Sequence, residues 1–318
     1  MNIFPEIKDK IKGLIFGQAI GDALGLASEF LSKEEVSFHY PDGINSYSQI
    51  IQDKHRSRWG KGDWTDDTDQ FLCILTSLLN KKEVDLLDIA NELYLWSNDT
   101  PMGIGVTTYK VLNMPQYTLF PQKAAKIIWK IKKKDLAPNG ALMRNSIVGV
   151  WKFWELDNVL QNSENIAELT HFDQRCKDSC KTVSYLIASE LNSKSIDQNE
   201  LKKYVDTLDT RLGEYISFPI SAEIDSFHLD EPKEIGYTLK ALSAGLWAYY
   251  NANNFKDGIK QIIEQGGDAD TNGCIAGSLL GAKFGFNAIP SEWVNELNKK
   301  EELNNIYSQY INLLELIY

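Results

Sequence analysis

Residues 62–79 read GDWTDDTDQFLCILTSLL, a turn rich in aspartate and threonine that is followed at once by apolar side chains. The apolar part, residues 71–79, predicts a helix that is buried on most sides. The spacing of apolar residues over 239–250 predicts another helix, and residues 293–318 show a similar helical pattern at the C-terminal end. Alternating strand patterns are nearly absent. No stretch has the length and composition of a linker between domains, and the polar stretch 192–230 is interpreted as a surface excursion. We therefore predict one all-α domain over residues 1–318.

The composition is that of a globular protein, because 43% of the 318 residues are hydrophobic and only 24% are charged. The formal net charge of −11 argues against a sequence-specific nucleic-acid-binding protein, since such proteins neutralise phosphates with Lys and Arg. This net charge is still compatible with a cationic patch on one part of the surface. Four cysteines in a chain of this length do not form a disulfide scaffold. All four fall in predicted helices, which indicates reduced core thiols: Cys73, Cys176, Cys180 and Cys274.

The N-terminal segment could be mistaken for a signal peptide, because three lysines precede the apolar residues 13–20. Asp22 and four glycines interrupt this region, and a buried acid suits a functional site better than a signal sequence. No stretch of the chain approaches the roughly 20 apolar residues that a membrane span requires. We therefore expect a cytoplasmic protein that has no membrane partner.

The acidic turn before residue 71 has a counterpart two hundred residues later. In both places Asp and Thr residues precede an apolar helix: Thr65, Asp66, Asp67 and Thr68 in the first, and Asp268, Asp270 and Thr271 in the second. Gly266 and Gly267 permit the backbone conformations that a tight ligand-binding turn requires. The second turn is not an EF-hand loop, because a hydrophobic helix without a ligating Glu follows it.

Two interpretations of these turns compete. As helix caps, Thr and Asp would satisfy free N–H groups and suit the positive end of the helix dipole. This accounts for one or two residues at each start, but adjacent carboxylates repel one another unless a cation is present. Oxygen donors without His or Cys select Mg²⁺, Mn²⁺ or Ca²⁺, and four carboxylates carry about four negative charges, which suits two divalent ions. We favour a paired metal site over two unrelated helix caps.

Several blocks of the sequence resemble, in this order, the signatures of the ADP-ribosylglycohydrolases. These blocks are residues 17–25, Glu29-Phe30, 62–70, 139–144, Thr170-His171, 266–272, 281–285, Ile289-Pro290 and Trp293. The resemblance extends over about residues 11–296. It implies an orthogonal helical bundle with two Mg²⁺ or Mn²⁺ ions in a central cleft.

The resemblance also implies which residues hold the metals and which act on the substrate. The implied metal ligands are Thr65, Asp66, Asp67, Asp268, Asp270 and Thr271. The implied catalytic carboxylates are Asp66 and Asp67, which hold the ions, and Glu29, which would orient or deprotonate the water or gate the site. Asp22 is interpreted as structural, bonding a neighbouring helix end. Asp22 and Glu29 would share a helix face if the first helix continued that far.

The remaining blocks resemble contacts to ADP-ribose. Residues 100–105 resemble the loop that cradles the diphosphate and the proximal ribose, which implies binding by Gly103, Ile104 and Gly105. The resemblance adds Asn139, Gly140 and His171 as substrate contacts and Arg144 as a support residue, and it gives no role to His39, His55 or His228. Some bacterial members carry an aspartate where this chain has Gly103, and we expect that Asp99 could occupy similar space.

The function implied is hydrolysis of the glycosidic bond at C1″ of ADP-ribose linked to a protein side chain. Arginine is the first expectation for the linkage, and serine, a nucleobase or O-acetyl-ADP-ribose are the alternatives. A non-catalytic ADP-ribose-binding module and a two-metal phosphohydrolase are competing functions. The intact acidic residues argue against the first, and the sequence blocks argue against the second.

Overall fold

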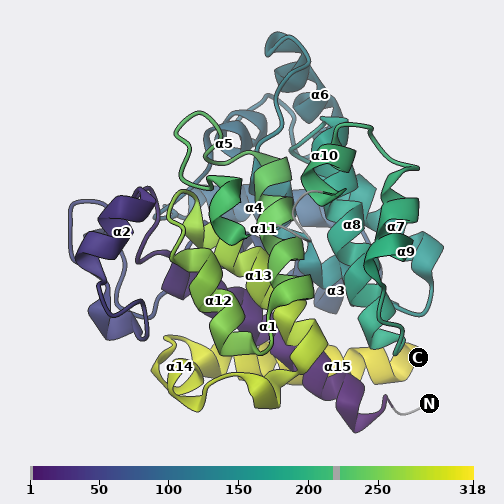
Figure 1. Cartoon of the computed structure of the whole chain (residues 1–318). Helices are drawn as coiled ribbons and strands as arrows, with labels where there is room; N and C mark the ends of the chain where they lie inside the picture. The colour runs from purple at the N-terminus through teal and green to yellow at the C-terminus, as the bar shows by residue number, and fades with distance from the viewer. Residues whose placement is uncertain (1–2, 218–222) are drawn as a thin grey trace.

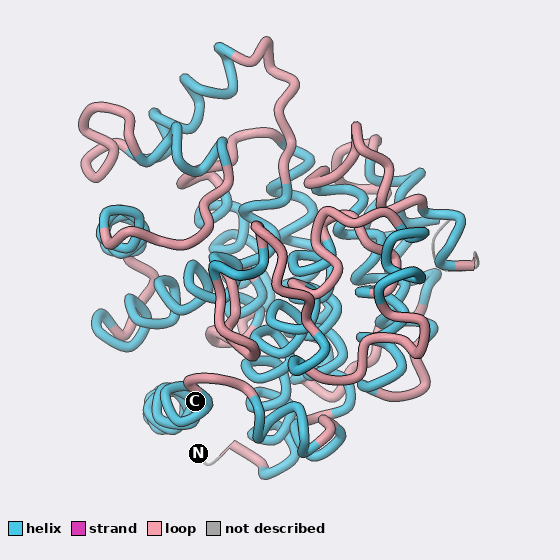
Figure 2. The backbone as a smooth tube through the Cα atoms, turned by 90° about the vertical axis from the view of Figure 1, so that its left-hand side faces the viewer, coloured by secondary structure: helices cyan, strands magenta, loops and turns pink. Residues whose placement is uncertain are grey.

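The computed structural model describes residues 3–217 and 223–318 (Figure 1). Within these residues the chain consists of helices and loops (Figure 2), and the β contacts amount to one bridge between Pro138 and Tyr237. This confirms the predicted all-α class. The α-helices are α1 (Pro5–Gly25), α2 (Lys33–His39), α3 (Asp66–Lys81), α4 (Leu86–Asn98), α5 (Val106–Leu112), α6 (Pro121–Ile131), α7 (Leu156–Ala167), α8 (Gln174–Leu191), α9 (Gln198–Val205), α10 (Leu212–Ser217), α11 (Thr238–Asn251), α12 (Phe255–Ile263), α13 (Ala269–Phe284), α14 (Ser291–Glu296) and α15 (Lys300–Ile317).

The helix predictions over 71–79 and 239–250 are confirmed by α3 and α11, and three details need correction. First, α1 ends at Gly25, so Glu29 does not share a helix face with Asp22. Second, residues 192–230 are not only a surface excursion, because α9 and α10 bury Leu201 and Leu212 in the core. Third, the single predicted C-terminal helix is divided into α14 and α15.

The centre of the fold is a close antiparallel contact between α1 and α13 (Figure 1). Glycines recur at every fourth position on the facing sides of both helices, and i, i+4 residues share one helix face. A Cβ atom on Gly17 would lie 2.2 Å from the carbonyl oxygen of Gly277, and one on Gly21 would lie 1.9 Å from that of Gly273. No side chain fits there, so the two helix backbones are in direct contact. This contact places the last turn of α1 beside the first turn of α13.

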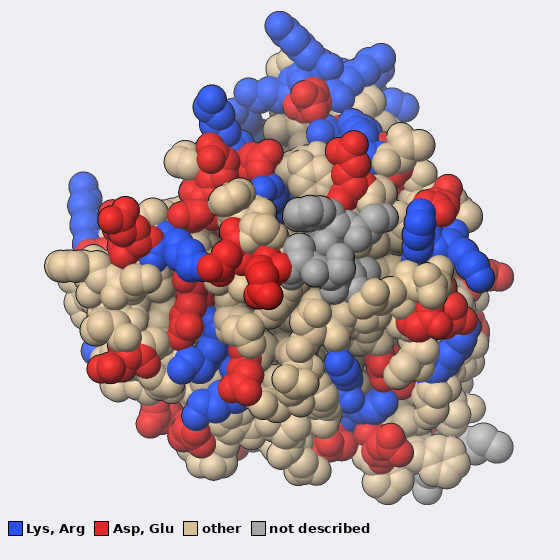
Figure 3. Space-filling model, viewed as in Figure 1, with Lys and Arg blue, Asp and Glu red and all other residues tan. Residues whose placement is uncertain are grey.

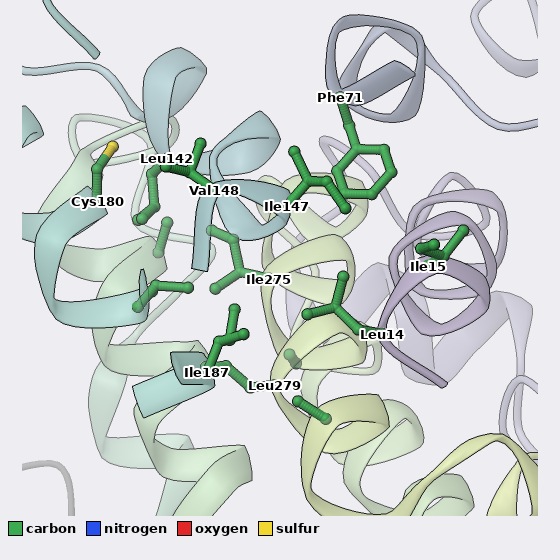
Figure 4. Packing of buried hydrophobic residues seen from close by; sticks show 14 of the residues in the cluster. Leu14, Ile15, Phe71, Leu142, Ile147, Val148, Cys180, Ile187, Ile275 and Leu279 are labelled. Atoms are coloured by element: carbon green, nitrogen blue, oxygen red, sulfur yellow. The ribbon is translucent and has the colours of Figure 1, made fainter. Parts of the chain in front are cut away.

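The hydrophobic core surrounds this helix pair. In Figure 4, Leu14 of α1, Ile187 of α8 and both Ile275 and Leu279 of α13 point toward one another, and Phe71 of α3 approaches from the side. The four cysteines are buried and unpaired, as the sequence predicted. No helix in the described residues combines the length and hydrophobicity that crossing a membrane requires.

Candidate functional site

A buried carboxylate of α1 holds the start of α3. Asp22 accepts hydrogen bonds from the backbone N–H groups of Thr65 and Thr68, both at 2.9 Å, and from the Thr68 hydroxyl at 2.6 Å. Burial raises the pKa of Asp22 to about 7, and the hydrogen bonds from Thr68 and Thr65 oppose this rise. The geometry agrees with the predicted structural role of Asp22 at the end of a neighbouring helix.

The turn that follows α1 carries Glu29 and is tied to the loop before α13. The backbone N–H of Phe30 donates to the carbonyl of Gly267 at 2.6 Å, and the N–H of Gly267 donates back to the carbonyl of Leu31 at 2.9 Å. Gly267 has φ +67°, a conformation in which L-residues are strained. This backbone pair fixes Glu29 next to the aspartates at the start of α13.

The two acidic turns meet, with Glu29 between them. Oxygen atoms of Glu29, Asp268 and Asp270 all lie within 4.8 Å of one another. The hydroxyl of Thr65 lies 3.4 Å from Asp67 Oδ2 and 3.5 Å from Asp270 Oδ2, so it bridges the starts of α3 and α13. Residues about two hundred positions apart in the sequence therefore form one acidic cluster.

Burial strongly perturbs the acids of this cluster. Burial, followed by the charges of neighbouring acids, raises the pKa of Asp66 to about 7. Burial raises the pKa of Asp268 to about 6, and the hydrogen bond from Asn139 opposes the rise. Burial and the neighbouring carboxylates also raise the pKa values of Asp67 and Asp270 well above the usual range. So many carboxylates in one buried place favour either protonation or a bound cation.

The donor set fits a hard divalent cation. Asp67 Oδ1 is buried and has no hydrogen-bond partner among the described residues, whereas nearly all buried carboxylate oxygens in proteins are bonded. Thr271 hydrogen-bonds the same carboxylate. The nearby donors are carboxylate and hydroxyl oxygens, which Mg²⁺, Mn²⁺ and Ca²⁺ prefer.

A cavity of about 490 Å³ opens on the acidic cluster. Its wall includes every residue proposed from the sequence as a substrate contact: Gly103, Ile104, Gly105, Asn139, Gly140 and His171. Asn139 Nδ2 donates to Asp268 Oδ2 at 2.6 Å, which links this wall to the acids. A Cβ atom on Gly140 would lie 3.1 Å from the ring of His171, so the two residues form one continuous surface.

A chain of buried hydrogen bonds connects His171 to the acidic cluster. Gln70 Nε2 donates to Asp66 Oδ2 at 2.9 Å, and Gln70 Oε1 accepts from Arg144 Nη1 at 2.6 Å. Arg144 Nη2 donates to the Thr170 hydroxyl at 2.5 Å, which is 2.7 Å from His171 Nδ1. Burial and the positive charge of Arg144 lower the pKa of His171 to about 3, so the imidazole is neutral.

Comparison with known proteins identifies the family. The sequence model of ADP-ribosylglycohydrolase matches residues 4–317, almost the whole chain. The chain belongs to the ADP-ribosylglycohydrolase family. ADP-ribosylarginine hydrolase Tri1 of Serratia proteamaculans is 28% identical over 96% of this chain and 79% of its own length. The ADP-ribosyl-[dinitrogen reductase] glycohydrolase of Rhodospirillum rubrum is 27% identical over 94% of this chain and 93% of its own length.

The fold of this glycohydrolase also has a close counterpart among solved structures. A chain described as an ADP-ribosylglycohydrolase-related protein complex superposes with a TM-score of 0.77 and 26% sequence identity. The match covers 98% of this chain and 99% of that chain. The family and its named relatives are hydrolases, so this chain is an ADP-ribosylglycohydrolase.

The structure gives His55 of this glycohydrolase a place that the sequence analysis did not. His55 Nε2 lies 2.6 Å from Glu29 Oε2, and its Nδ1 accepts from Arg58 at 2.7 Å. Together with Phe30 and Trp59, His55 lines the cavity on the side of Glu29. His55 could have been identified from the sequence because residues 55–59 read HRSRW, a concentration of His, Arg and Trp immediately before the first acidic turn.

Arg56 holds the turn that carries Glu29. Its buried guanidinium donates from Nε to the carbonyls of Leu26 and Ala27, both at 2.9 Å, and from Nη2 to the carbonyl of Glu29. Nη1 bonds the carboxylate of Asp53. A charged group bonded to three carbonyls of one turn fixes the path of that turn.

Gly103 lies directly against Asp66, at the place where some family members carry an aspartate. A Cβ atom on Gly103 would lie 2.7 Å from Asp66 Oδ1, so a larger side chain would displace that acid. Asp99 does not replace it, because Asp99 lines a separate surface depression with Asp69 and Trp96. The expectation that Asp99 occupies the same space is therefore wrong.

Proposed function

We propose that this glycohydrolase removes ADP-ribose from modified protein side chains by metal-dependent hydrolysis, with arginine as the linkage. The observation that carries the proposal is the meeting of two aspartate turns and Glu29 at the wall of the cavity that also holds His171 and the glycine turn. The arginine linkage is supported by the relatives named as ADP-ribosylarginine hydrolases in Serratia proteamaculans and Pseudomonas putida.

The residues that would hold the cations come from the starts of α3 and α13. They are Thr65, Asp66, Asp67, Asp268, Asp270 and Thr271. A pair of divalent cations held by these residues, Mg²⁺ or Mn²⁺, would supply positive charge for binding the distal ribose hydroxyls and for making an attacking water more acidic. The carboxylates supply the negative charge that stabilises an oxocarbenium-like transition state at C1″.

Glu29 is the carboxylate best placed to orient or deprotonate the water. Its backbone is fixed by Arg56 and by the pairing of its turn with Gly267, and its carboxylate is bonded by His55. A general base acts efficiently only when it is held within hydrogen-bond reach of its proton. These contacts restrict Glu29 to the side of the cavity that faces Asp268 and Asp270.

The rest of the cavity wall would bind the ADP-ribose. Backbone N–H groups in a glycine turn such as 103–105 can bind phosphate oxygens without a basic side chain. Neutral His171 has its Nδ1 engaged by Thr170, and its Nε2 would lie 3.2 Å from a Cβ on Gly140. This arrangement suits a hydrogen bond between the imidazole and a ribose hydroxyl.

The test is release of ADP-ribose from substrates that differ only in the linkage. Proteins or peptides carrying ADP-ribose on Arg, Ser or Cys, and O-acetyl-ADP-ribose, are incubated with the enzyme in Mg²⁺, in Mn²⁺ and in excess EDTA. We expect intact ADP-ribose from the arginine substrate, with no release in EDTA and recovery when metal is restored. Binding without release would indicate a reader module. Free phosphate or AMP would indicate a phosphohydrolase, and release in EDTA would exclude the metal-dependent mechanism.

A further inference from the structure

One segment of the chain has a charge opposite to that of the rest. Residues 100–134 contain seven lysines and no Asp, Glu or Arg. The other residues hold 26 Lys and Arg against 44 Asp and Glu, a formal charge of −18. The seven lysines are all exposed and belong to α5, to α6 and to the turn after α6: Lys110, Lys123, Lys126, Lys130, Lys132, Lys133 and Lys134. We call this surface the α5–α6 lysine surface.

No carboxylate of the described residues neutralises the positive charge of this surface. In the described residues, none of the seven lysines lies within ion-pair distance of a carboxylate, although many other lysines of the chain do, such as Lys177 and Lys240. Two of the seven contact aromatic rings instead: Lys123 lies 5.6 Å from the ring of Phe120, and Lys126 lies 5.0 Å from that of Phe172. Figure 3 shows Lys and Arg side chains gathered at the top of the molecule, over α6.

Helix stability does not account for this charge. Cations favour the last turn of a helix, which explains Lys130 and the three lysines after α6. Lys123 lies in the first turn of α6 and Lys126 in the second, where the positive end of the helix dipole gives a cation no benefit. An exposed cluster that costs electrostatic self-repulsion and has no carboxylate partner among the described residues fits an external anionic partner.

The lysine surface stands beside the candidate site because its two ends line the cavity. The chain leaves the cavity wall at residues 103–108, forms α5 and α6, which pack against each other, and returns to the wall at residues 138–140. In Figure 1, α6 projects from the top of the molecule. A partner bound to this projection would therefore contact the segment whose two ends line the cavity.

The same surface carries exposed apolar side chains. Leu119 is 60% exposed, Phe120 53% and Ile131 66%, and all three flank the ends of α6. Exposed apolar groups among charges are typical of protein–protein contact sites, whereas binding of a nucleic-acid backbone relies on charge alone. The charge of −18 on the rest of the chain also opposes a long polyanion more than a compact acidic protein.

From these observations we propose that the α5–α6 lysine surface is the docking site for the modified substrate protein, and that the docked face of that protein is acidic. The inference rests on the proposed function, because it assigns the surface to the protein that delivers ADP-ribose to the cavity. Charges arranged this way mainly raise the association rate and select partners, and their effect weakens with salt.

The test compares substrates that share the modified residue and differ in the flanking charge. They are ADP-ribosylarginine itself, a peptide with ADP-ribosylarginine between Gly/Ser segments, and the same peptide with Asp/Glu in both segments. Flanks of about ten residues on each side reach roughly 30 Å from the modified residue, so they can contact the surface around the cavity. The variant is K123E/K126E/K130E, and the matched control is K194E/K202E/K203E, which makes the same charge change on exposed lysines around α9.

We expect the native enzyme to show kcat/KM about tenfold higher for the acidic than for the Gly/Ser peptide at low salt. This preference should fall with salt, disappear in K123E/K126E/K130E and persist in the control. Activity on ADP-ribosylarginine should be unchanged in both variants. An unchanged acidic preference in K123E/K126E/K130E would overturn the proposal. An equal loss on all three substrates would also overturn it, because the lysines would then attract the diphosphate itself.

A binding measurement keeps this test separate from the catalytic proposal. Each protein is titrated into fluorescent acidic and Gly/Ser peptides that lack ADP-ribose, and binding is followed by fluorescence anisotropy. Fluorescent single-stranded RNA and duplex DNA of matched charge are titrated in the same way. Binding of the acidic peptide that is lost in K123E/K126E/K130E supports docking even if no substrate is hydrolysed, in which case only the catalytic proposal fails. Binding of the nucleic acids but not of the acidic peptide would replace a protein partner by a nucleic acid.

Discussion

Asp22 and Asp67 are buried carboxylates on either side of the start of α3, and they differ in their hydrogen bonding. Asp22 accepts three hydrogen bonds, two from backbone N–H groups and one from a hydroxyl of α3. Asp67 lies one residue into α3, and its Oδ1 has no partner among the described residues. The protein itself supplies hydrogen-bond donors to Asp22, whereas Asp67 Oδ1 lacks, in the described part of the chain, a partner that a bound cation would supply.

This difference separates stability from function at one helix start. A buried carboxylate with all its partners contributes to stability, because removing it leaves several donors without an acceptor. A buried carboxylate that keeps one oxygen without a partner among other carboxylates, as Asp67 does, costs stability unless a cation is bound. Substitution of Asp22 should therefore lower stability, whereas substitution of Asp67 should lower activity without lowering stability.

The largest expected effect is loss of activity on the side of the acidic cluster. Asp67→Asn and Asp270→Asn each remove a proposed metal ligand with almost no change in shape, and kcat/KM should fall by at least ~10²–10³-fold. In EDTA the free energy of unfolding should stay equal or rise, because each change removes repulsion between carboxylates. The measurements are steady-state kinetics in Mn²⁺ and urea unfolding in EDTA.

Asp99→Asn is the matched control for these variants, because Asp99 lies outside the cavity. It should keep full activity and stability. Full activity in Asp67→Asn would exclude the acidic cluster as the reaction centre.

An intermediate effect, on stability, is expected on the other side of the helix start. Asp22→Ala leaves two backbone donors and the Thr68 hydroxyl without their acceptor, so the free energy of unfolding should fall by about 2–4 kcal/mol. Thr68→Val removes only one of the three bonds and should cost about 1 kcal/mol. Urea unfolding in EDTA measures both. A loss of activity without a loss of stability in Asp22→Ala would place this residue in the site instead of the scaffold.

The sequence predicted the features that depend on local pattern. Apolar periodicity gave the helix class, and a concentration of Asp and Thr beyond what helix capping needs marked the starts of α3 and α13. The proposed ligands and substrate contacts lie around one cavity, although this placement does not test their individual roles.

The sequence could not give the features that depend on contacts between distant segments. Glycine at every fourth position of α1 is visible in the sequence, but its match to the glycines of α13 exists only in three dimensions. His55 belongs to an irregular turn without periodicity, so nothing local placed its ring on Glu29. Asp99 is close to Gly103 in sequence, but its side chain lines a different depression because α4 ends just before it.

The smallest expected effect is a change of stability with pH. Bound metal should remove the part of this change that comes from the acidic cluster and leave the part that comes from Asp22. Burial raises the pKa of Asp66 to about 7 and that of Asp268 to about 6, above the ~3.9 of an unfolded chain. The folded protein then binds more protons than the unfolded one between about pH 4 and pH 7, so stability is highest at the acid end of this window and falls as pH rises.

In EDTA the melting temperature should therefore decrease from pH 5 to pH 8. Mn²⁺ should raise it by more at pH 8 than at pH 5, because protons and cations compete for the same carboxylates. Burial raises the pKa of Asp22 to about 7 as well, but its oxygens are bonded to Thr65 and Thr68, so this part of the pH dependence should remain in Mn²⁺. A melting temperature in EDTA that rises from pH 5 to pH 8 would contradict this prediction. It would mean that the carboxylates of the cluster are ionised and that other groups of the protein neutralise them. The contrast between Asp22 and Asp67 would then have no physical basis.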